Sequence, residues 1–196
     1  MKYSISVKIK SPKNHGSIKG FASVVLDNVF KITNILIEQN NITNELFISM
    51  PRFNTGEVND KGLPVWKDVC HPLTADFRDE LSQNILATYK NAVEGKKEVL
   101  EVDNGAQEEL EFTLKLQPLK NPSNKVLATG HIYIDSFFII ENVRLLNGKN
   151  GPFIAFPACK TKGLYGTGKV EFKDICYPMT KELRKKLSEA ALENVC

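Results

Sequence analysis

The residues of this chain best suited to do chemistry are basic side chains near its C-terminus. A glycine-containing loop supplies Lys160, Lys162, Lys169 and Lys173, and the segment after it supplies Lys181, Arg184, Lys185 and Lys186. Cations gathered on one surface bind phosphates, position a nucleic acid and give an affinity that falls with salt. The alternative is a solvated charged face, which charge-rich helices usually have.

Aromatic residues lie in or beside similar segments and could stack on unpaired bases. They are Phe53, Trp66, Tyr165 and Phe172, of which Tyr165 is the best candidate. Trp66 and Phe172 occupy equivalent positions in an internal repeat of the sequence, which indicates that both pack into the protein instead. Arg52 and Lys67, from the first half of the chain, complete the candidate nucleic-acid-binding residues.

Residues that could catalyse a reaction or hold a metal do not occur in a pattern that either task requires. The four cysteines include no C-x-x-C pair, so no zinc site is indicated. Cys70 and His71 are adjacent on an expected strand, where their side chains should point to opposite faces rather than form a nucleophile–base pair. Asp68 and Asp174 are expected in ion pairs or capping hydrogen bonds. We therefore predict no enzyme activity, no metal and no cofactor.

The composition is that of a globular protein, with 42% hydrophobic residues and a formal net charge of +3 over 196 residues. So small a net charge does not itself indicate a nucleic-acid partner, and any anion-binding surface must come from local clustering. We find no apolar run of signal-peptide type and none long enough for a membrane span. We expect a soluble cytoplasmic protein with reduced thiols and no membrane partner.

An internal repeat is the strongest signal in the sequence. Residues 47–89 align with residues 153–195 without a gap, with 14 identities over 43 positions. The matched stretch includes the pattern K-D-[VI]-C-[HY]-P-[LM]-T, and upstream segments match with small insertions. We predict two related domains, residues 1–92 and 110–196, joined by a linker at 93–109.

Each repeat reads as a sheet followed by a helix. Alternation at residues 4–10 predicts a half-buried strand with Ile5, Val7 and Ile9 inward. Further strands are expected at 21–26, 30–37, 45–50 and 65–70, with a tight turn at Asp27-Asn28 and a loop at 52–64. In the linker, residues 99–102 could form a short strand pairing with residues 110–116.

The helix of each repeat has a clear start and a clear apolar face. Thr74 and Thr180 are the expected N-caps. The apolar stripes are Phe77, Leu81 and Ile85 in one helix and Leu183, Leu187 and Ala191 in the other. The fold class is therefore α+β, with about five antiparallel strands and a C-terminal helix in each domain. A lone copy of this size would be marginal, so we infer that the two lobes pack on each other or pair strands.

Several ordered motifs make each repeat resemble the SpoVG family (stage V sporulation protein G, septation regulator). In the first half they are Leu26-Asp27-x-x-Phe30-x-Ile32 and Lys67-Asp68-Val69-x-His71-Pro72. In the second half they are Ile134-Asp135-x-x-Phe138-x-Ile140, Gly151-Pro-Phe153-Ile-Ala-Phe156-Pro157 and Phe172-Lys173-Asp174-Ile175-x-x-Pro178. The resemblance covers nearly the whole chain, once per repeat.

This resemblance implies small bacterial proteins that dimerise through their sheets, several binding DNA and some RNA as regulators. Their binding is attributed to a basic loop after the F-x-x-x-P strand and to the neighbouring helix. A fused pair would then be an intramolecular pseudo-dimer, as a monomer or a homo-oligomer. The loop of the first half is longer and hardly basic, whereas that of the second half is more basic.

We therefore predict a non-enzymatic DNA- or RNA-binding regulatory protein that works mainly through its second half. The alternative is a protein–protein interaction module that has lost nucleic-acid binding and presents a sheet edge to a protein partner.

Overall fold

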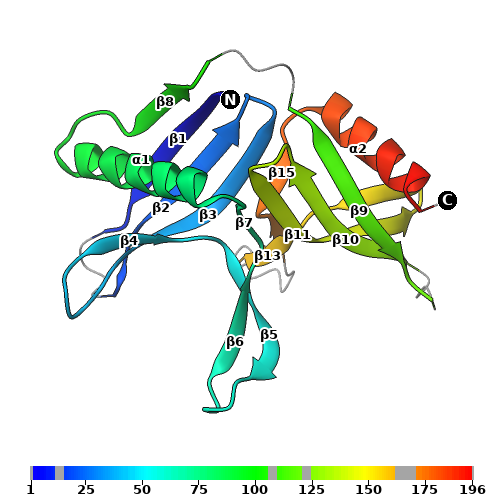
Figure 1. Ribbon diagram of the computed structural model, residues 1–196, viewed down its shortest axis with the longest axis horizontal. Coiled ribbons are helices and arrows are strands. Elements are labelled where there is room, and N and C mark those ends of the chain that lie inside the picture. Colours follow the sequence, from blue (N-terminus) through cyan, green and yellow to red (C-terminus); the bar gives the residue numbers. More distant parts are fainter. Residues whose placement is uncertain (1, 12–15, 106–109, 121–124, 162–170, 196) are drawn as a thin grey trace.

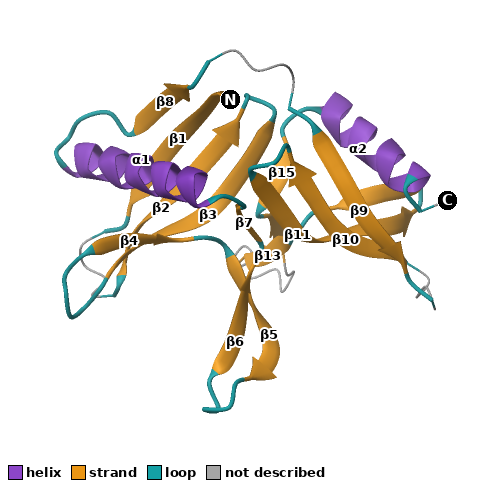
Figure 2. Ribbon diagram, viewed as in Figure 1, coloured by secondary structure: helices purple, strands orange, loops and turns teal. Residues whose placement is uncertain are grey.

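A computed structural model describes residues 2–11, 16–105, 110–120, 125–161 and 171–195 of the chain. Each half forms an antiparallel sheet with one helix lying across it (Figures 1 and 2). The first sheet contains β1 (Lys2–Ile9), β2 (Ile18–Leu26), β3 (Phe30–Gln39), β4 (Leu46–Ser49) and β8 (Val99–Asp103). The second contains β9 (Phe112–Pro118), β10 (Val126–Ile134), β11 (Phe138–Gly148) and β12 (Gly151–Ala155). The α+β class is thus confirmed.

The two halves exchange a short strand. Strand β7 (Cys70–Pro72) belongs to the first half of the sequence but pairs with β11 of the second sheet, which places Cys70 opposite Ile140. Strand β15 (Cys176–Pro178) does the reverse and pairs with β3, placing Cys176 opposite Ile32. The prediction that residues 65–70 complete their own sheet is therefore wrong. The chain breaks its pairing at Val69 and crosses over, so that each short strand covers an edge that would otherwise expose unpaired backbone groups.

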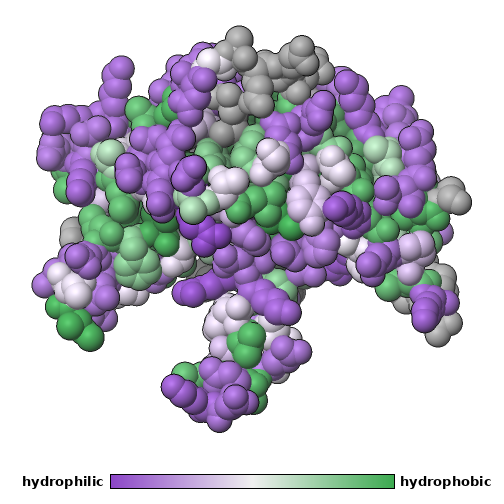
Figure 3. Space-filling view, in the orientation of Figure 1, coloured by the Kyte–Doolittle hydropathy of each residue, from purple (hydrophilic) through white to green (hydrophobic). Residues whose placement is uncertain are grey.

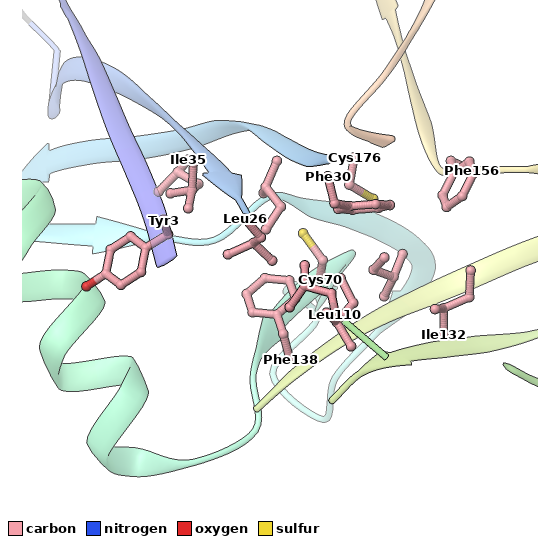
Figure 4. Close-up of a cluster of buried hydrophobic side chains, with 14 of the residues drawn as sticks. Tyr3, Leu26, Phe30, Ile35, Cys70, Leu110, Ile132, Phe138, Phe156 and Cys176 are labelled. Carbon is pink, nitrogen blue, oxygen red and sulfur yellow. The ribbon is translucent and has the colours of Figure 1, made fainter. Parts of the chain in front are cut away.

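One apolar core runs through both halves. The ring of Phe30 lies 5.8 Å from that of Phe112 and 5.7 Å from that of Phe156, both in the second half. Phe77 of the first helix lies 5.1 Å from Phe137. Figure 4 shows Phe30 among side chains contributed by both halves. Aromatic packing of this kind adds to the free energy gained by burial, so the halves stabilise each other.

The helices begin where the sequence predicts. Helix α1 spans Ala75–Val93, and the Thr74 hydroxyl accepts a hydrogen bond from the Phe77 amide at 3.3 Å. Helix α2 spans Lys181–Glu193, and the Thr180 hydroxyl accepts from the Leu183 amide at 3.1 Å. The predicted apolar stripes are confirmed, since Phe77, Leu81, Ile85, Leu187 and Ala191 are buried and Leu183 is half-buried.

The aspartates of the Asp-x-x-Phe motifs have a structural task. Asp27 and Asn28 both adopt positive φ angles, 42° and 59°, and form the predicted tight turn between β2 and β3. The Asp27 carboxylate also accepts a hydrogen bond from the Lys2 amide at 2.9 Å. Asp135 does the same with the Glu111 amide at 2.8 Å. The motif therefore fixes how the first strand of each half meets its hairpin.

Two other expectations for the first sheet need correction. Ile9 shares the face of Ile5 and Val7 by strand alternation, but at the last position of β1 it is 38% exposed and not buried. Residues 99–102 do form a strand, β8, but it pairs with β1 and not with residues 110–116. Leu100 and Val102, alternate residues of β8, pack against the core, so their partial burial favours the place of β8 at the edge of the first sheet.

The expected loop at residues 52–64 is instead a β-hairpin. We call it arm 1: β5 (Arg52–Val58) and β6 (Pro64–Asp68), which project away from the sheets (Figure 1). The equivalent arm 2 consists of β13 (Ala158–Thr161) and β14 (Glu171–Asp174). Of the glycines that suggested a loop, Gly62 lies in the turn at residues 59–63, and Gly56 lies within β5 where the pairing shifts between Asn54 and Val58.

Candidate nucleic-acid interface

Arm 2 presents its basic residues on two opposite faces. Lys160 lies directly across the ladder from Phe172, and Asp174 follows two residues later on the same face. Lys173 pairs with Cys159 on the other face. That second face turns toward the first sheet, because the Asn34 side-chain amide donates to the Cys159 sulfur at 3.4 Å. Lys160 and Lys173 therefore lie on opposite faces of arm 2.

Helix α2 is tied directly to the Lys160 face of arm 2. The Arg184 guanidinium donates to the Asp174 carboxylate at 3.4 Å and lies 5.7 Å from the centre of the Phe156 ring. The loop and the helix predicted to act together are thus joined by one ion pair. Because both side chains are more than a third exposed, this ion pair contributes little to the stability of the fold and mainly positions α2 against arm 2.

The cations of α2 divide between two flanks. At 100° per residue, Lys181 lies about 60° around the helix from Arg184, whose flank faces arm 2. Lys185 lies about 100° from Arg184, on the solvent-facing side of the helix opposite the buried Leu187. Lys186 lies about 160° around the helix from Arg184, on the side of the helix that carries Glu182 and Glu193. Lys181, Lys185 and Lys186 are all exposed, and Lys185 makes only an exposed ion pair with Glu189, at 3.6 Å.

We call the surface so formed the helix–arm surface of the second half. It consists of Lys160, Phe172, Asp174, Lys181, Arg184 and Lys185. Four of these six residues are basic and one is acidic. Lys173 and Lys186 lie outside it, and Lys162, Tyr165 and Lys169 fall outside the residues that the structure describes.

The first half carries a much less basic version of this surface. Its equivalent residues are Asn54, Trp66, Asp68, Ala75, Arg78 and Asp79, with Arg52 in place of Ala158. Two basic residues are therefore balanced by two acidic ones. The difference arises mainly on the helix, where Ala75 and Asp79 stand in place of Lys181 and Lys185.

The two first-half candidates are separated in the same way as those of arm 2. The Arg52 guanidinium lies 5.8 Å from the centre of the Trp66 ring and 4.0 Å from the Glu38 carboxylate. Lys67 is exposed on the opposite face of arm 1, across the ladder from Phe53. Arg52 therefore has partners of its own within the first half.

The prediction that Trp66 and Phe172 pack into the protein is wrong. Trp66 is 52% exposed and Phe172 is 63% exposed. Each lies on a two-stranded arm, which lacks the second layer that buries an aromatic residue in a sheet. Figure 3 shows arm 1 standing clear of the body with hydrophilic and hydrophobic side chains mixed on its surface. Equivalence within a repeat indicated a shared role, but not whether that role lies inside or outside the core.

Among the residues that the structure describes, the cysteines and histidines are not gathered into one cluster. Cys70 and Cys176 are buried, and the hydrogen bond with Cys176 together with burial raises the pKa of the Cys70 thiol, which disfavours the thiolate. The His131 Nδ1 lies 3.2 Å from the Glu141 carboxylate. Within the described ranges, no group of three His, Cys, Asp or Glu side chains could hold a metal ion. Among those same residues, no helix has the length and hydrophobicity to cross a membrane.

Comparisons with known proteins agree with the internal repeat. The SpoVG family model matches the chain twice, over residues 1–91 and 112–195. A Treponema denticola protein bearing the name septation protein SpoVG is 36% identical over 73 residues, 37% of this chain and 72% of its own. One of the same name from Clostridium botulinum (strain Alaska E43) is 33% identical over 90 residues, 45% of this chain and 88% of its own. No solved structure shows significant similarity. The chain therefore belongs to the SpoVG family and carries two copies of its domain in tandem.

Proposed function

We propose that this protein is a non-enzymatic regulator that binds DNA or RNA through the helix–arm surface of its second half. The supporting observation is that Arg184 ties α2 to arm 2 through Asp174, so that the side chains of Lys160, Lys181 and Lys185 extend from connected elements. Four cations outnumber the two carboxylates that pair with them, Asp174 with Arg184 and Glu189 with Lys185, and this excess of positive charge favours a phosphate backbone over a neutral partner.

In this proposal the two halves act as an intramolecular pseudo-dimer with unequal surfaces. Exchange of β7 and β15 and the shared core around Phe30 support a fixed relation between the halves. The less basic first half would then serve mainly to hold the second half in its shape. The protein needs no second chain to cover these two sheet edges.

The test measures how affinity for a fluorescent oligonucleotide changes with salt, by anisotropy between about 50 and about 200 mM. If all four cations contact phosphates of a duplex, the slope of log affinity against log salt should approach about −3.6, a loss of about 100-fold over this range. Lys181→Ala with Lys185→Ala should reduce the magnitude of the slope by about 2.

Lys186→Ala is the matched control, since it removes one positive charge from the same helix on the other flank. We expect it to leave the slope nearly unchanged. Equal effects of Lys186→Ala and Lys185→Ala would mean that only net charge matters. Absence of salt-dependent binding by the unaltered protein would refute the function itself.

A further inference from the structure

The exposed ring of Phe172 is the feature of the helix–arm surface that phosphate binding does not use. It lies 63% exposed on β14, directly across the ladder from Lys160. Side chains opposite each other on paired strands have their Cβ atoms about 5 Å apart, so the ring and the ammonium group are neighbours. On its other side, two residues along the strand, Asp174 is held by Arg184.

This arrangement sets a flat apolar face between cations. In a duplex the faces of the bases are covered by their neighbours in the stack, and the backbone phosphates are what the protein meets first. In a single strand the base faces are free to stack on an aromatic side chain while the flanking phosphates contact cations. A duplex would use Lys160, Lys181 and Lys185 but would leave the Phe172 ring in water.

The other half of the molecule repeats the pairing of ring and cation. Trp66, at the position equivalent to Phe172, is 52% exposed, and Arg52 lies 5.8 Å from its ring centre. Although the two residues differ in type, both copies keep an aromatic ring outside the core beside a basic group. Two arms of one chain thus present the same kind of ring to solvent.

We propose that Phe172 stacks on an unpaired base, and that the ligand of the helix–arm surface is a single-stranded nucleic acid. This inference rests on the proposed function and adds to it the class of nucleic acid. A protein partner is less well matched, because among the residues that the structure describes the neighbours of Phe172 on this surface are charged side chains and not other apolar ones.

The first experiment compares an oligothymidylate with a duplex of equal length, by anisotropy at one salt concentration, for the unaltered protein and for Phe172→Ala. Loss of one stacked base corresponds to a fall in affinity of about 5- to 150-fold for the single strand. Duplex affinity should be unchanged, because the cations remain. Circular dichroism should show an intact fold, since the ring is exposed.

The second experiment uses the fact that Trp66 is the only tryptophan of the sequence. Trp66→Phe combined with Phe172→Trp moves the fluorescent side chain to arm 2. Oligothymidylate should quench its emission in step with the anisotropy change, whereas Trp66→Phe alone should bind with unchanged affinity and give no tryptophan signal.

The outcomes separate the two proposals. If Phe172→Ala binds the single strand as tightly as the unaltered protein, or if duplex is bound more tightly, the inference is overturned while binding through the cations stands. If neither oligonucleotide binds, both proposals fail. Capture of a protein through Phe172 without oligonucleotide binding would likewise overturn the inference.

Discussion

Replacing Phe30 by alanine should destabilise the second half of the chain although Phe30 belongs to the first. Its side chain is fully buried, and its ring lies within 6 Å of two rings of the second half, at 5.8 Å from Phe112 and 5.7 Å from Phe156. Truncating a buried phenylalanine to alanine costs about 3 to 5 kcal/mol. Whole domains are stable by about 5 to 15 kcal/mol, so the loss is a large fraction of the total.

Urea unfolding followed by circular dichroism measures the global effect. With a slope near the upper end for single domains, about 3 kcal/mol/M, the midpoint should fall by about 1 to 1.7 M. Hydrogen exchange then locates the effect. The amides of β9 to β12 should lose protection in parallel with those of β1 to β3, because exchange of core amides follows global stability.

Phe21→Ala is the matched control, because Phe21 is 38% exposed on the outer face of the first sheet. The same truncation there should cost less than about 1 kcal/mol. Loss of protection confined to the first sheet in Phe30→Ala, with two separate unfolding transitions, would show that the halves are independent and would refute the reasoning.

Two further predictions concern the unequal helices and the buried thiols. Ala75→Lys with Asp79→Lys introduces into α1 the two lysines that α2 has at the equivalent positions, 181 and 185. The slope of log affinity for an oligonucleotide against log salt should then increase in magnitude by up to about 2. An unchanged slope would argue that lysines at these positions do not contact phosphates. An alkylating reagent near neutral pH should modify Cys159 while Cys70 and Cys176 react only on unfolding; equal reactivity would contradict their burial. Because the folded-state pKa of Cys70 is raised, its stabilising contribution is complete below its ordinary pKa of 9.0 and is lost as pH rises through the folded value, so the urea midpoint should fall above about pH 9.

The local parts of the fold could be predicted because they depend on nearby residues. The Thr74 and Thr180 caps follow from hydroxyl groups at the right spacing, and the turn at Asp27-Asn28 from residues that tolerate positive φ. The repeat likewise predicted two similar sheet-and-helix units. Each of these inferences needs only a short stretch of sequence.

The exchange of β7 and β15 could not be located from the sequence, because a strand of three residues carries no sign of which sheet it joins. Choosing between Cys70 beside its own sheet and Cys70 opposite Ile140 requires knowing how the whole core closes. The turn residues of arm 1 similarly obscured a hairpin whose pairing is irregular.

The sequence predicted the type of the candidate site but not which residues share one surface. Residue types identified the basic segments, and the structure places Lys160, Lys181, Arg184 and Lys185 on connected elements. The sequence prediction grouped Lys173 with Lys160, but strand alternation places Lys173 on the other face of arm 2. The sequence did contain one overlooked signal. Phe172 and Asp174 are two residues apart on a strand, so they share a face, and the ring therefore lies beside the ion pair between Asp174 and Arg184.

Acetylation of lysines with and without a bound oligonucleotide tests the central claim most directly. Mass spectrometry should show Lys160, Lys181 and Lys185 protected by the bound strand, while Lys186, on the far flank of the same helix, reacts as it does in the free protein. Equal protection of Lys186, or no protection of the other three under conditions where the oligonucleotide is bound, would contradict the account.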